Sequence, residues 1–296
     1  MKKTYKFQHS ALRCFIFCCS NLPLPVMRAI GRSCGLLYYI FNNRRVDIAR
    51  YNLKLCYPQL SQEKREKIVK NQCMQAGMWV MEAGAAWGWT PEKAMKKMTI
   101  RNERTLLDAE ASGRGVIVGI PHLGNWEMLN HYFCSRHEMT ALFKPDDKQP
   151  ALTEFILEQR NRNGIIMAPA DKRGIRALIK SLRSGRLVAL LPDHIPSEGM
   201  GVYAPFYGHP AYTDTLISSL ARKHDAIVLL ATALRTKNGF DIVFDVVKNQ
   251  SSEDPCQAAK GINEAVETAI NRAPSQFQWM YGRFKKQPAD SSLNYP

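Results

Sequence analysis

The sequence predicts an α/β fold in which helices cover both faces of a largely parallel, mixed sheet, with a helical arm at the N-terminus. Two observations predict it. From about residue 100, short apolar runs alternate with helical segments, as in chains that form parallel sheets. Before that point the patterns are those of helices, and no internal repeat or low-complexity linker interrupts the chain.

The composition is that of a globular protein with an anionic partner. The chain has 296 residues, of which 45% are hydrophobic and 23% are charged, enough for one large domain or two small ones. Lysine and arginine exceed the acids by 41 to 26, a net charge of +15. This excess indicates nucleic acid, an acidic membrane surface or an acidic protein as partner.

The first 41 residues are expected to form a helical hairpin. Two apolar stretches, residues 11–19 and 36–41, are each too short to span a bilayer. The first 50 residues carry nine basic side chains and one acid, a net charge of +8. Such a segment suits the surface of an anionic membrane, so we expect a separable arm. The alternative is an arm packed on the protein's own core.

Two further helices are predicted at residues 45–56 and 61–87, and Ser61 is a fair N-cap for the second. Trp79 and Trp87 lie toward its end among several methionines, and Pro91 ends the run. Such a stripe is more often core or interface than a cofactor site, although tryptophan and methionine also suit contact with lipid chains.

The remaining elements follow from apolar runs bounded by glycine and proline and from helical periodicity. Strands are predicted at residues 116–120, 140–143, 165–168, 187–191, 201–205, 226–233 and 240–247. Helices are predicted at residues 103–111, 126–136, 150–162, 173–183, 213–223 and 256–272.

A histidine and a glutamate follow the strand at residues 116–120. Pro121 ends that strand, His122 lies in the loop, and Gly124-Asn125 can cap a helix that begins at Trp126. Open α/β sheets bind their ligands at this end of a strand. Glu127, five residues on, could accept the Nδ1 proton of His122 and leave Nε2 as a base. The alternative is a histidine that merely caps a turn.

No nucleophile accompanies this pair. The chain has no Gly-x-Ser-x-Gly sequence, and no cysteine lies beside a second histidine. The base is therefore expected to activate a hydroxyl group of the substrate, in acyl transfer without an acyl-enzyme intermediate.

The strand at residues 187–191 ends like the first, in Pro192-Asp193-His194, so the two strand ends could converge on one site. A metal site made by His122, Glu127, Asp193 and His194 would instead indicate a metal-dependent hydrolase. We disfavour that alternative because the chain has no close-spaced ligand pair such as His-Glu-x-x-His. Asp193 could also be a simple loop or helix cap.

Residues 160–186 contain eight basic side chains and one acid, a net charge of +7. The stretch could receive phosphate groups or an acidic carrier protein. It has no aromatic residue and the chain shows no nucleic-acid-binding motif, which argues against nucleic acid. Candidate carrier-docking residues are Arg173, Arg176, Lys180 and Arg183.

The segment from Gly199 to Thr213 is rich in glycine and aromatic residues. Tyr203, Phe206 and Tyr207, together with Trp126, are candidates for the wall of an acyl pocket. An equally weighted alternative is a hydrophobic hairpin in the core.

Four stretches together resemble the lipid A biosynthesis acyltransferases, the late acyltransferases of Gram-negative bacteria within the wider glycerolipid acyltransferase class. They are His122 with Glu127, residues 172–194, residues 202–213 with Pro205-Phe206-Tyr207-Gly208, and residues 276–286 with Gln278-Trp279-Met280-Tyr281. They cover most of residues 115–288, and the four in this order are a specific signature.

The resemblance implies transfer of a fatty acyl chain from acyl carrier protein, or from acyl-coenzyme A, to a hydroxyl group of an acylated lipid A precursor, which is a phosphorylated glycolipid. It implies no cofactor and a place on the cytoplasmic face of the inner membrane. It further implies a membrane-associating segment at residues 1–41 and an acyltransferase domain at residues 42–296, with a helical lead-in at 45–95 and an α/β core at 100–288.

By match to the family's motifs, His122 would be the base and Glu127 the residue that orients it. Arg160 and Asp193 match residues of two other family motifs, and with Asn125 and Arg283 they are candidates for substrate binding or for stabilising an oxyanion. The chain departs from the family pattern at Lys144-Pro145, at Gly282 and at Thr213-Asp214-Thr215. These departures leave the base intact and bear on which acceptor and which acyl chain length the protein uses.

A third hypothesis is a non-enzymatic protein that binds anionic membranes.

Overall fold

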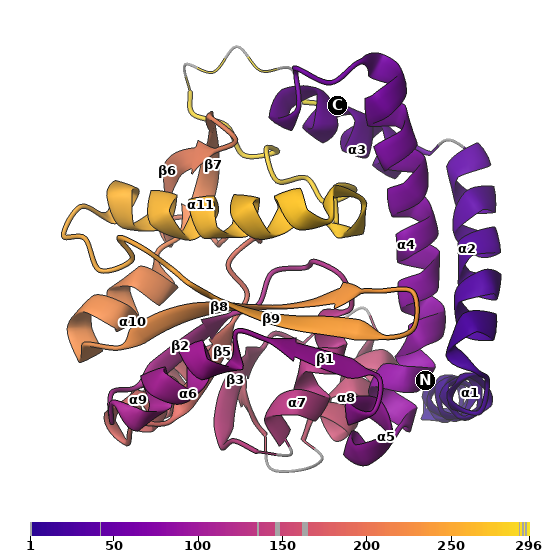
Figure 1. The fold of residues 1–296 in the computed structure, drawn as a ribbon, viewed down its shortest axis with the longest axis horizontal. Helices are drawn as coiled ribbons and strands as arrows, with labels where there is room; N and C mark the ends of the chain where they lie inside the picture. The colour runs from indigo at the N-terminus through magenta and orange to yellow at the C-terminus, as the bar shows by residue number, and fades with distance from the viewer. Residues whose placement is uncertain are drawn as a thin grey trace.

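The computed structural model of the chain describes all residues except 1, 42, 135, 146–148, 162–164, 290, 292 and 294, and gives no side-chain environment for residues 2–6. Its helices are α1 Lys2–Ser20, α2 Leu24–Ile40, α3 Arg44–Cys56, α4 Gln62–Gly88, α5 Pro91–Met95, α6 Glu103–Ala111, α7 Leu129–Cys134, α8 Pro150–Arg160, α9 Lys172–Arg183, α10 Leu216–His224 and α11 Pro255–Arg272, with 3₁₀ turns at Trp126–Met128 and Pro274–Gln276. Figure 1 shows their arrangement.

The strands are β1 Met98–Arg101, β2 Val116–Gly119, β3 Met139–Phe143, β4 Ile166–Pro169, β5 Leu187–Leu190, β6 Gly201–Phe206, β7 His209–Asp214, β8 Ile227–Arg235 and β9 Phe240–Val246. The described residues form a seven-stranded sheet in the order β1-β9-β8-β2-β5-β3-β4. Its neighbouring strands run parallel except for the hairpin pair β8 and β9. The predicted largely parallel, mixed sheet is confirmed.

Both faces of the sheet are buried, because side chains along each central strand alternate between two cores. On β2, Ile117 belongs to a core formed with α9, α10 and α11, whereas Val116 and Val118 belong to a core formed with α5, α6, α7 and α8. In Figure 1, α11 and α7 lie on opposite sides of the sheet. The protein is therefore an α/β sandwich with helices on both faces.

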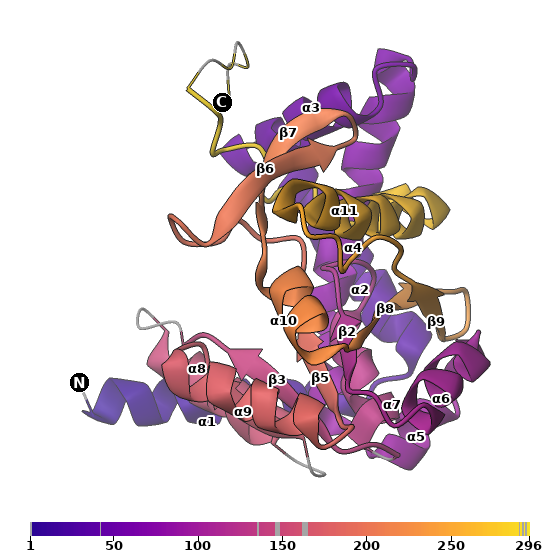
Figure 2. The ribbon, with the colours of Figure 1, turned by 90° about the vertical axis from the view of Figure 1, so that its left-hand side faces the viewer.

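The strand predicted at residues 201–205 is not part of this sheet. It is β6, which pairs with β7 in a separate two-stranded hairpin. Tyr207 and Gly208 connect them with positive φ angles of 49° and 78°, the backbone of a tight two-residue hairpin turn. Because β7 continues to Asp214, the helix predicted from residue 213 begins only at Leu216. Figure 2 shows this hairpin beyond α11, away from the large sheet.

Smaller differences concern element ends. The helix predicted at 126–136 is a 3₁₀ turn followed by a short α7 that ends at Cys134. The helix predicted at 150–162 ends at Arg160, and residue 162 lies outside the described part of the chain. Strand β1 at the sheet edge and the short helix α5 were not predicted.

The N-terminal arm packs on the rest of the protein. Helix α2 lies against α4 so closely that a Cβ atom on Gly77 would be 2.0 Å from the carbonyl oxygen of Gly31, and only glycine allows this contact. Met27 is fully buried in the core, and the Nε of Arg28 donates a 2.6 Å hydrogen bond to the buried Glu82. We therefore no longer expect a chain that lacks residues 1–41 to keep its folded core.

The outer surface of the same arm is apolar. Phe17 is 69% exposed, Leu37 is 56% exposed and Phe41 is 81% exposed. Within the part of the chain that the structure describes, neither these helices nor any others combine the length and apolar character that a bilayer crossing requires.

Candidate active site

His122 is held by Asp193 at the ends of two neighbouring strands. Strands β2 and β5 are paired with Gly119 opposite Leu190, so the loops that follow them emerge side by side. Asp193 accepts a 2.8 Å hydrogen bond from the backbone N–H of His122, and its other oxygen lies 2.9 Å from Nδ1 of the ring. The expected convergence of the two strand ends is therefore present.

Gly124 fixes the loop that carries His122. Its φ angle is +68°, and a Cβ atom at this position would lie 2.0 Å from the carbonyl oxygen of Ala233 on β8. The neighbouring Asn125 N–H donates to that same carbonyl at 2.8 Å. The loop thus turns tightly against the sheet, which only glycine permits here.

The electrostatics of the pair define its tautomer. Burial raises the pKa of Asp193, but the charge of His122 and the two hydrogen bonds more than offset it, so the pKa lies below its usual range. An ionised carboxylate only accepts hydrogen bonds, so Nδ1 carries the proton and Nε2 is the basic nitrogen. The arrangement is that of a general base held by a carboxylate.

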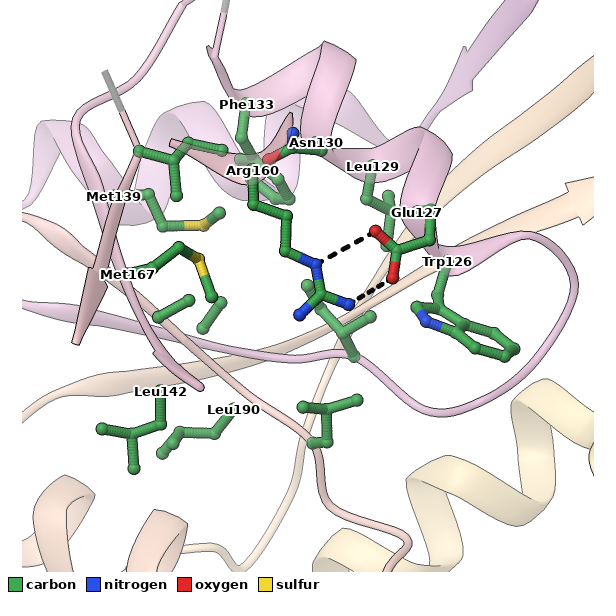
Figure 3. A pocket seen from close by; sticks show the side chains of 15 residues that line it. Trp126, Glu127, Leu129, Asn130, Phe133, Met139, Leu142, Arg160, Met167 and Leu190 are labelled. Carbon is green, nitrogen blue, oxygen red and sulfur yellow. Dashed lines mark hydrogen bonds and ion pairs between the residues drawn. The ribbon is translucent and has the colours of Figure 1, made fainter. Parts of the chain in front are cut away.

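Glu127 does not orient His122 as the sequence suggested. Its oxygens accept hydrogen bonds from Nε of Arg160 at 3.1 Å, from Nη2 of Arg160, and from the indole N–H of Trp87 at 3.2 Å. Figure 3 shows Arg160 reaching along the pocket to both carboxylate oxygens. The physical reason is that the 3₁₀ turn at Trp126–Met128 directs Glu127 toward α4 and α8, while β5 brings Asp193 to the histidine.

Glu127 is buried and Arg160 is half-buried, with side-chain exposures of 5% and 24%. Burial alone raises the pKa of Glu127, but the charge of Arg160 and the hydrogen bonds from Arg160 and Trp87 bring it below its ordinary value. Glu127 is therefore an anion that neutralises and positions Arg160.

A stack of rings borders His122. The ring of His194 lies parallel to that of His122, with centroids 4.0 Å apart, and Tyr281 stacks on the other side of His194 at 4.4 Å. Desolvation of the stacked ring, and next the charge of His122, lower the pKa of His194 to about 4, although the residue as a whole remains exposed. His194 is thus a neutral ring at neutral pH.

An apolar cavity adjoins Glu127 and Arg160, with about 540 Å³ of empty space including its open mouth. Its walls come from β3, β4, β5, α7, α8 and the loop after β2, and include Trp126, Phe133, Met139 and Met167, as Figure 3 shows. Of the four residues proposed for the acyl pocket, Trp126 lines this cavity.

The other three proposed acyl-pocket residues lie elsewhere. Phe206 is 1% exposed in the core next to Phe284, and Tyr207 contacts Tyr57 and Trp279. Tyr203 lies on the same hairpin, and its hydroxyl donates to the carbonyl of Gln287 at 2.7 Å. The structure therefore places these three side chains in the hairpin that packs on α11 and not on the wall of the apolar cavity.

A second cavity, with about 1030 Å³ of empty space including its open mouth, lies on the His122 side. Helix α4 and the loop at residues 276–282 form much of its wall. It is lined by His122, Trp126, two arginines and four glutamines, namely Arg45, Arg235, Gln72, Gln75, Gln276 and Gln278. Trp126 lines both cavities, and its ring centroid lies 4.7 Å from that of His122. The base therefore lies close to the boundary between the apolar cavity and this more polar cavity.

Arg283 and Asn125, two candidates for substrate binding, are engaged within the protein. Arg283 is 3% exposed and donates to the carbonyl of Tyr212 at 2.8 Å and to the hydroxyl of Thr213 at 2.7 Å, so it fastens the C-terminal loop to the hairpin. Asn125 donates to Glu82 at 3.0 Å. Both side chains therefore hold the site's surroundings in place.

The four carrier-docking candidates are exposed along α9. Arg173, Arg176, Lys180 and Arg183 follow one another at helical spacing and so share one face of the helix. Helix α9 packs on β3, β4 and β5, the strands that line the apolar cavity.

The metal alternative has no support in this geometry. Glu127 is turned to Arg160, and both oxygens of Asp193 already bind His122. The rings of His122 and His194 lie face to face, so their nitrogens do not converge. Across the described residues no group of three or more potential ligands is placed to hold an ion.

The sequence patterns did not predict the role of Glu82 of α4, or that Trp87 binds Glu127. Glu82 is fully buried and binds Arg28, Arg235 and Asn125, while Trp87 binds Glu127. The single signal was an acid inside an apolar helical stretch, which indicates a buried charge that must have partners.

Comparison with known proteins places these features in a family. The family model described as bacterial lipid A biosynthesis acyltransferase matches residues 2–286. The chain is 30% identical over 278 residues to the lipid A biosynthesis palmitoleoyltransferase of Escherichia coli (strain K12), covering 93% of this chain and 90% of that protein. It is 28% identical over 279 residues to the lipid A biosynthesis lauroyltransferase of the same organism, with the same coverage. A lipid A biosynthesis acyltransferase of Haemophilus influenzae is 28% identical over 278 residues, 92% of this chain and 88% of that protein.

Proposed function

The chain belongs to the bacterial lipid A biosynthesis acyltransferases and is an O-acyltransferase, and from this premise we propose its donor, its base and its place in the cell. The donor is a fatty acyl thioester of acyl carrier protein, and the acceptor is a hydroxyl group of a lipid A precursor. His122 is the general base, and no acyl-enzyme intermediate forms. The main support is that His122, fixed by Asp193, lines one cavity and lies against Trp126, which lines both that cavity and the apolar one.

In this mechanism the acceptor hydroxyl gives its proton to Nε2 of His122 as its oxygen attacks the thioester carbonyl. The carbon–oxygen bond forms, and the tetrahedral oxyanion then collapses with loss of the thiolate, which takes the proton from the imidazolium. Asp193 stabilises the imidazolium through its 2.9 Å contact with Nδ1. General-base catalysis of this kind contributes roughly 10²–10⁴-fold.

Arg160 is our candidate for the cation beside the developing oxyanion. It lines the apolar cavity, and two of its nitrogens bind Glu127, while Nη1 is not among the groups on that carboxylate. A donor at this position contributes about 3 kcal/mol to stabilisation of the transition state. Glu127 then acts through Arg160, as a positioning residue.

The apolar cavity is our candidate for the donor's acyl chain. Its walls are predominantly apolar, and methionines among them adapt to a flexible chain. The basic outer face of α9 lies over the same strands. We expect an acidic carrier protein to dock on this basic face.

We place the protein on the cytoplasmic face of the inner membrane. Exposed apolar side chains on α1 and α2, among them Phe17 and Phe41, lie in the same segment as the basic residues that give the first 50 residues a net charge of +8. This combination suits the surface of an anionic bilayer.

Mass spectrometry of lipid A from cells with and without this protein tests the proposed function. We expect the protein to add the mass of one or more fatty acyl groups, and a His122→Ala chain expressed at the same level to add none. Identical lipid A in all three strains would contradict the proposal.

A further inference from the structure

The polar cavity beside His122 contains buried hydrogen-bonding atoms that lack partners. Within the described part of the chain, no partner lies within hydrogen-bond distance of Gln72 Oε1, Trp79 Nε1 or Arg235 Nη2. Gln72 is 2% exposed and the Arg235 side chain is 4% exposed, and all three residues line this cavity. Buried polar groups without partners are rare in native proteins, so a cluster of them around one cavity points to a ligand.

The same wall carries an uncompensated positive charge. Arg28 and Arg235 share the single carboxylate of Glu82, at 2.6 Å and 2.7 Å, so this buried cluster of two guanidinium groups and one carboxylate has a net charge of +1. Arg45 adds a second, exposed cation to the lining, and none of the described carboxylates lines the cavity. An anionic group bound in the cavity would offset the cost of burying this charge.

We propose that this cavity binds the polar head of the acceptor, a phosphorylated glycolipid, with sugar oxygens on Gln72 and Trp79 and a phosphate facing Arg235 and Arg45. The inference rests on the proposed function and extends it by assigning the acceptor to this cavity. It places the acceptor hydroxyl on the His122 side, while the acyl chain of the donor enters from the apolar cavity. The donor and the acceptor then approach the base from different sides.

Gln72→Leu is the sharpest variant, because it removes the unpartnered carbonyl and keeps most of the side-chain volume. We expect the KM for the phosphorylated lipid A precursor to rise about 3- to 10-fold, as for the loss of one hydrogen bond. The KM for acyl carrier protein should change less than about twofold. The thermal midpoint should stay the same or rise, since the unbound protein loses a buried group that had no partner. Asn71→Leu also replaces an amide side chain with leucine, one residue earlier on α4. Asn71 is not among the residues that line either cavity, so this variant is the matched control.

Arg45→Gln tests the charge. Its defect should be about tenfold with the phosphorylated precursor and should largely disappear with the same glycolipid after phosphatase treatment. Equal defects with both glycolipids would overturn the placement of the phosphate. A Gln72→Leu protein whose acceptor KM matches that of Asn71→Leu, or whose two KM values rise equally, would overturn the assignment of the cavity.

Calorimetric binding separates a failure of this inference from a failure of the proposed function. In a His122→Ala background, which prevents turnover, the phosphorylated precursor should bind and Gln72→Leu should weaken that binding by the same 3- to 10-fold. If binding depends on Gln72 but the wild-type protein transfers no acyl group, the proposed function is wrong and the cavity assignment stands. If the wild-type protein transfers the group and binding ignores Gln72, the cavity assignment is wrong.

Discussion

Asp193→Asn should disable catalysis while leaving the fold intact. Asparagine has nearly the same shape as aspartate but no charge, and Asp193 makes two hydrogen bonds to His122 in a site where its own exposure is only 4%. Asp193 accepts one hydrogen bond on each carboxylate oxygen, one from Nδ1 and one from the backbone N–H of His122. An asparagine amide has only one accepting oxygen, and its NH₂ group is a donor. One of the two hydrogen bonds is therefore lost. The imidazolium that forms during the reaction also loses its counter-charge.

The size of the effect follows from these contacts. A hydrogen bond to a charged group is worth about 1.5–3 kcal/mol, and about 1.4 kcal/mol corresponds to a factor of ten in rate. Loss of the Asp193 carboxylate charge beside Nδ1 should therefore lower kcat by about 10²-fold. The comparable substitution in a serine protease triad, with loss of about 10⁴-fold, marks the upper limit.

The assay is steady-state acyl transfer by the purified variant, combined with a double-mutant cycle. Asp193→Asn should cost little in a His122→Ala background, because the two residues act as a unit. Glu127→Gln is the comparison, and its loss should add to that of Asp193→Asn because no contact joins the two carboxylates. An Asp193→Asn enzyme with more than about a tenth of wild-type kcat, or a full additional loss in the His122→Ala background, would refute the reasoning.

Three further predictions follow from other parts of the structure. Glu127→Gln leaves the half-buried Arg160 without its counter-charge, so urea unfolding at pH 7 should show a loss of up to roughly 3–5 kcal/mol. The pKa of Glu127 is lowered in the folded protein, so its contribution to stability is present above the ordinary value of 4.5 and is lost as the pH falls further. The difference in unfolding free energy between variant and wild type should therefore shrink on acidification. A difference that does not change with pH would contradict this. Arg176→Glu with Lys180→Glu should raise the KM for acyl carrier protein at low salt far more than the KM for acyl-coenzyme A. Lys64→Glu, which reverses an exposed charge on α4, should not. Equal effects on both donors would show that α9 is not the docking face. Phe17→Ser with Phe41→Ser should weaken sedimentation with anionic vesicles. The thermal midpoint should stay unchanged, because both side chains are exposed. Undiminished sedimentation would show that the membrane contact lies elsewhere.

The sequence predicted the elements that place His122, because a continuous apolar run ending in proline is a local pattern. The convergence with Asp193 was also predictable, since neighbouring parallel strands end at the same edge of the sheet. The partner of the histidine was not predictable. Five residues separate His122 from Glu127, and spacing alone does not show that a 3₁₀ turn directs the glutamate toward Arg160.

Features that join distant segments were also beyond the sequence patterns. The polar cavity brings Gln72 of α4 together with Arg235 of β8 and the loop at residues 276–282, which no local periodicity connects. The N-terminal arm showed its basic and apolar character in the sequence. That Arg28 of this arm would neutralise the buried Glu82 became visible only when α2 was placed on α4.

The central claim is that His122 deprotonates the acceptor hydroxyl for direct attack on the thioester. The most direct measurement incubates purified protein with acyl carrier protein carrying a labelled fatty acyl group and the phosphorylated lipid A precursor, and follows label on both substrates and on the protein. We expect label to move to the glycolipid as an ester without appearing on the protein, and His122→Ala to lower the rate by roughly 10²-fold or more. A labelled protein that forms and decays at the rate of turnover, or a fully active His122→Ala enzyme, would contradict it.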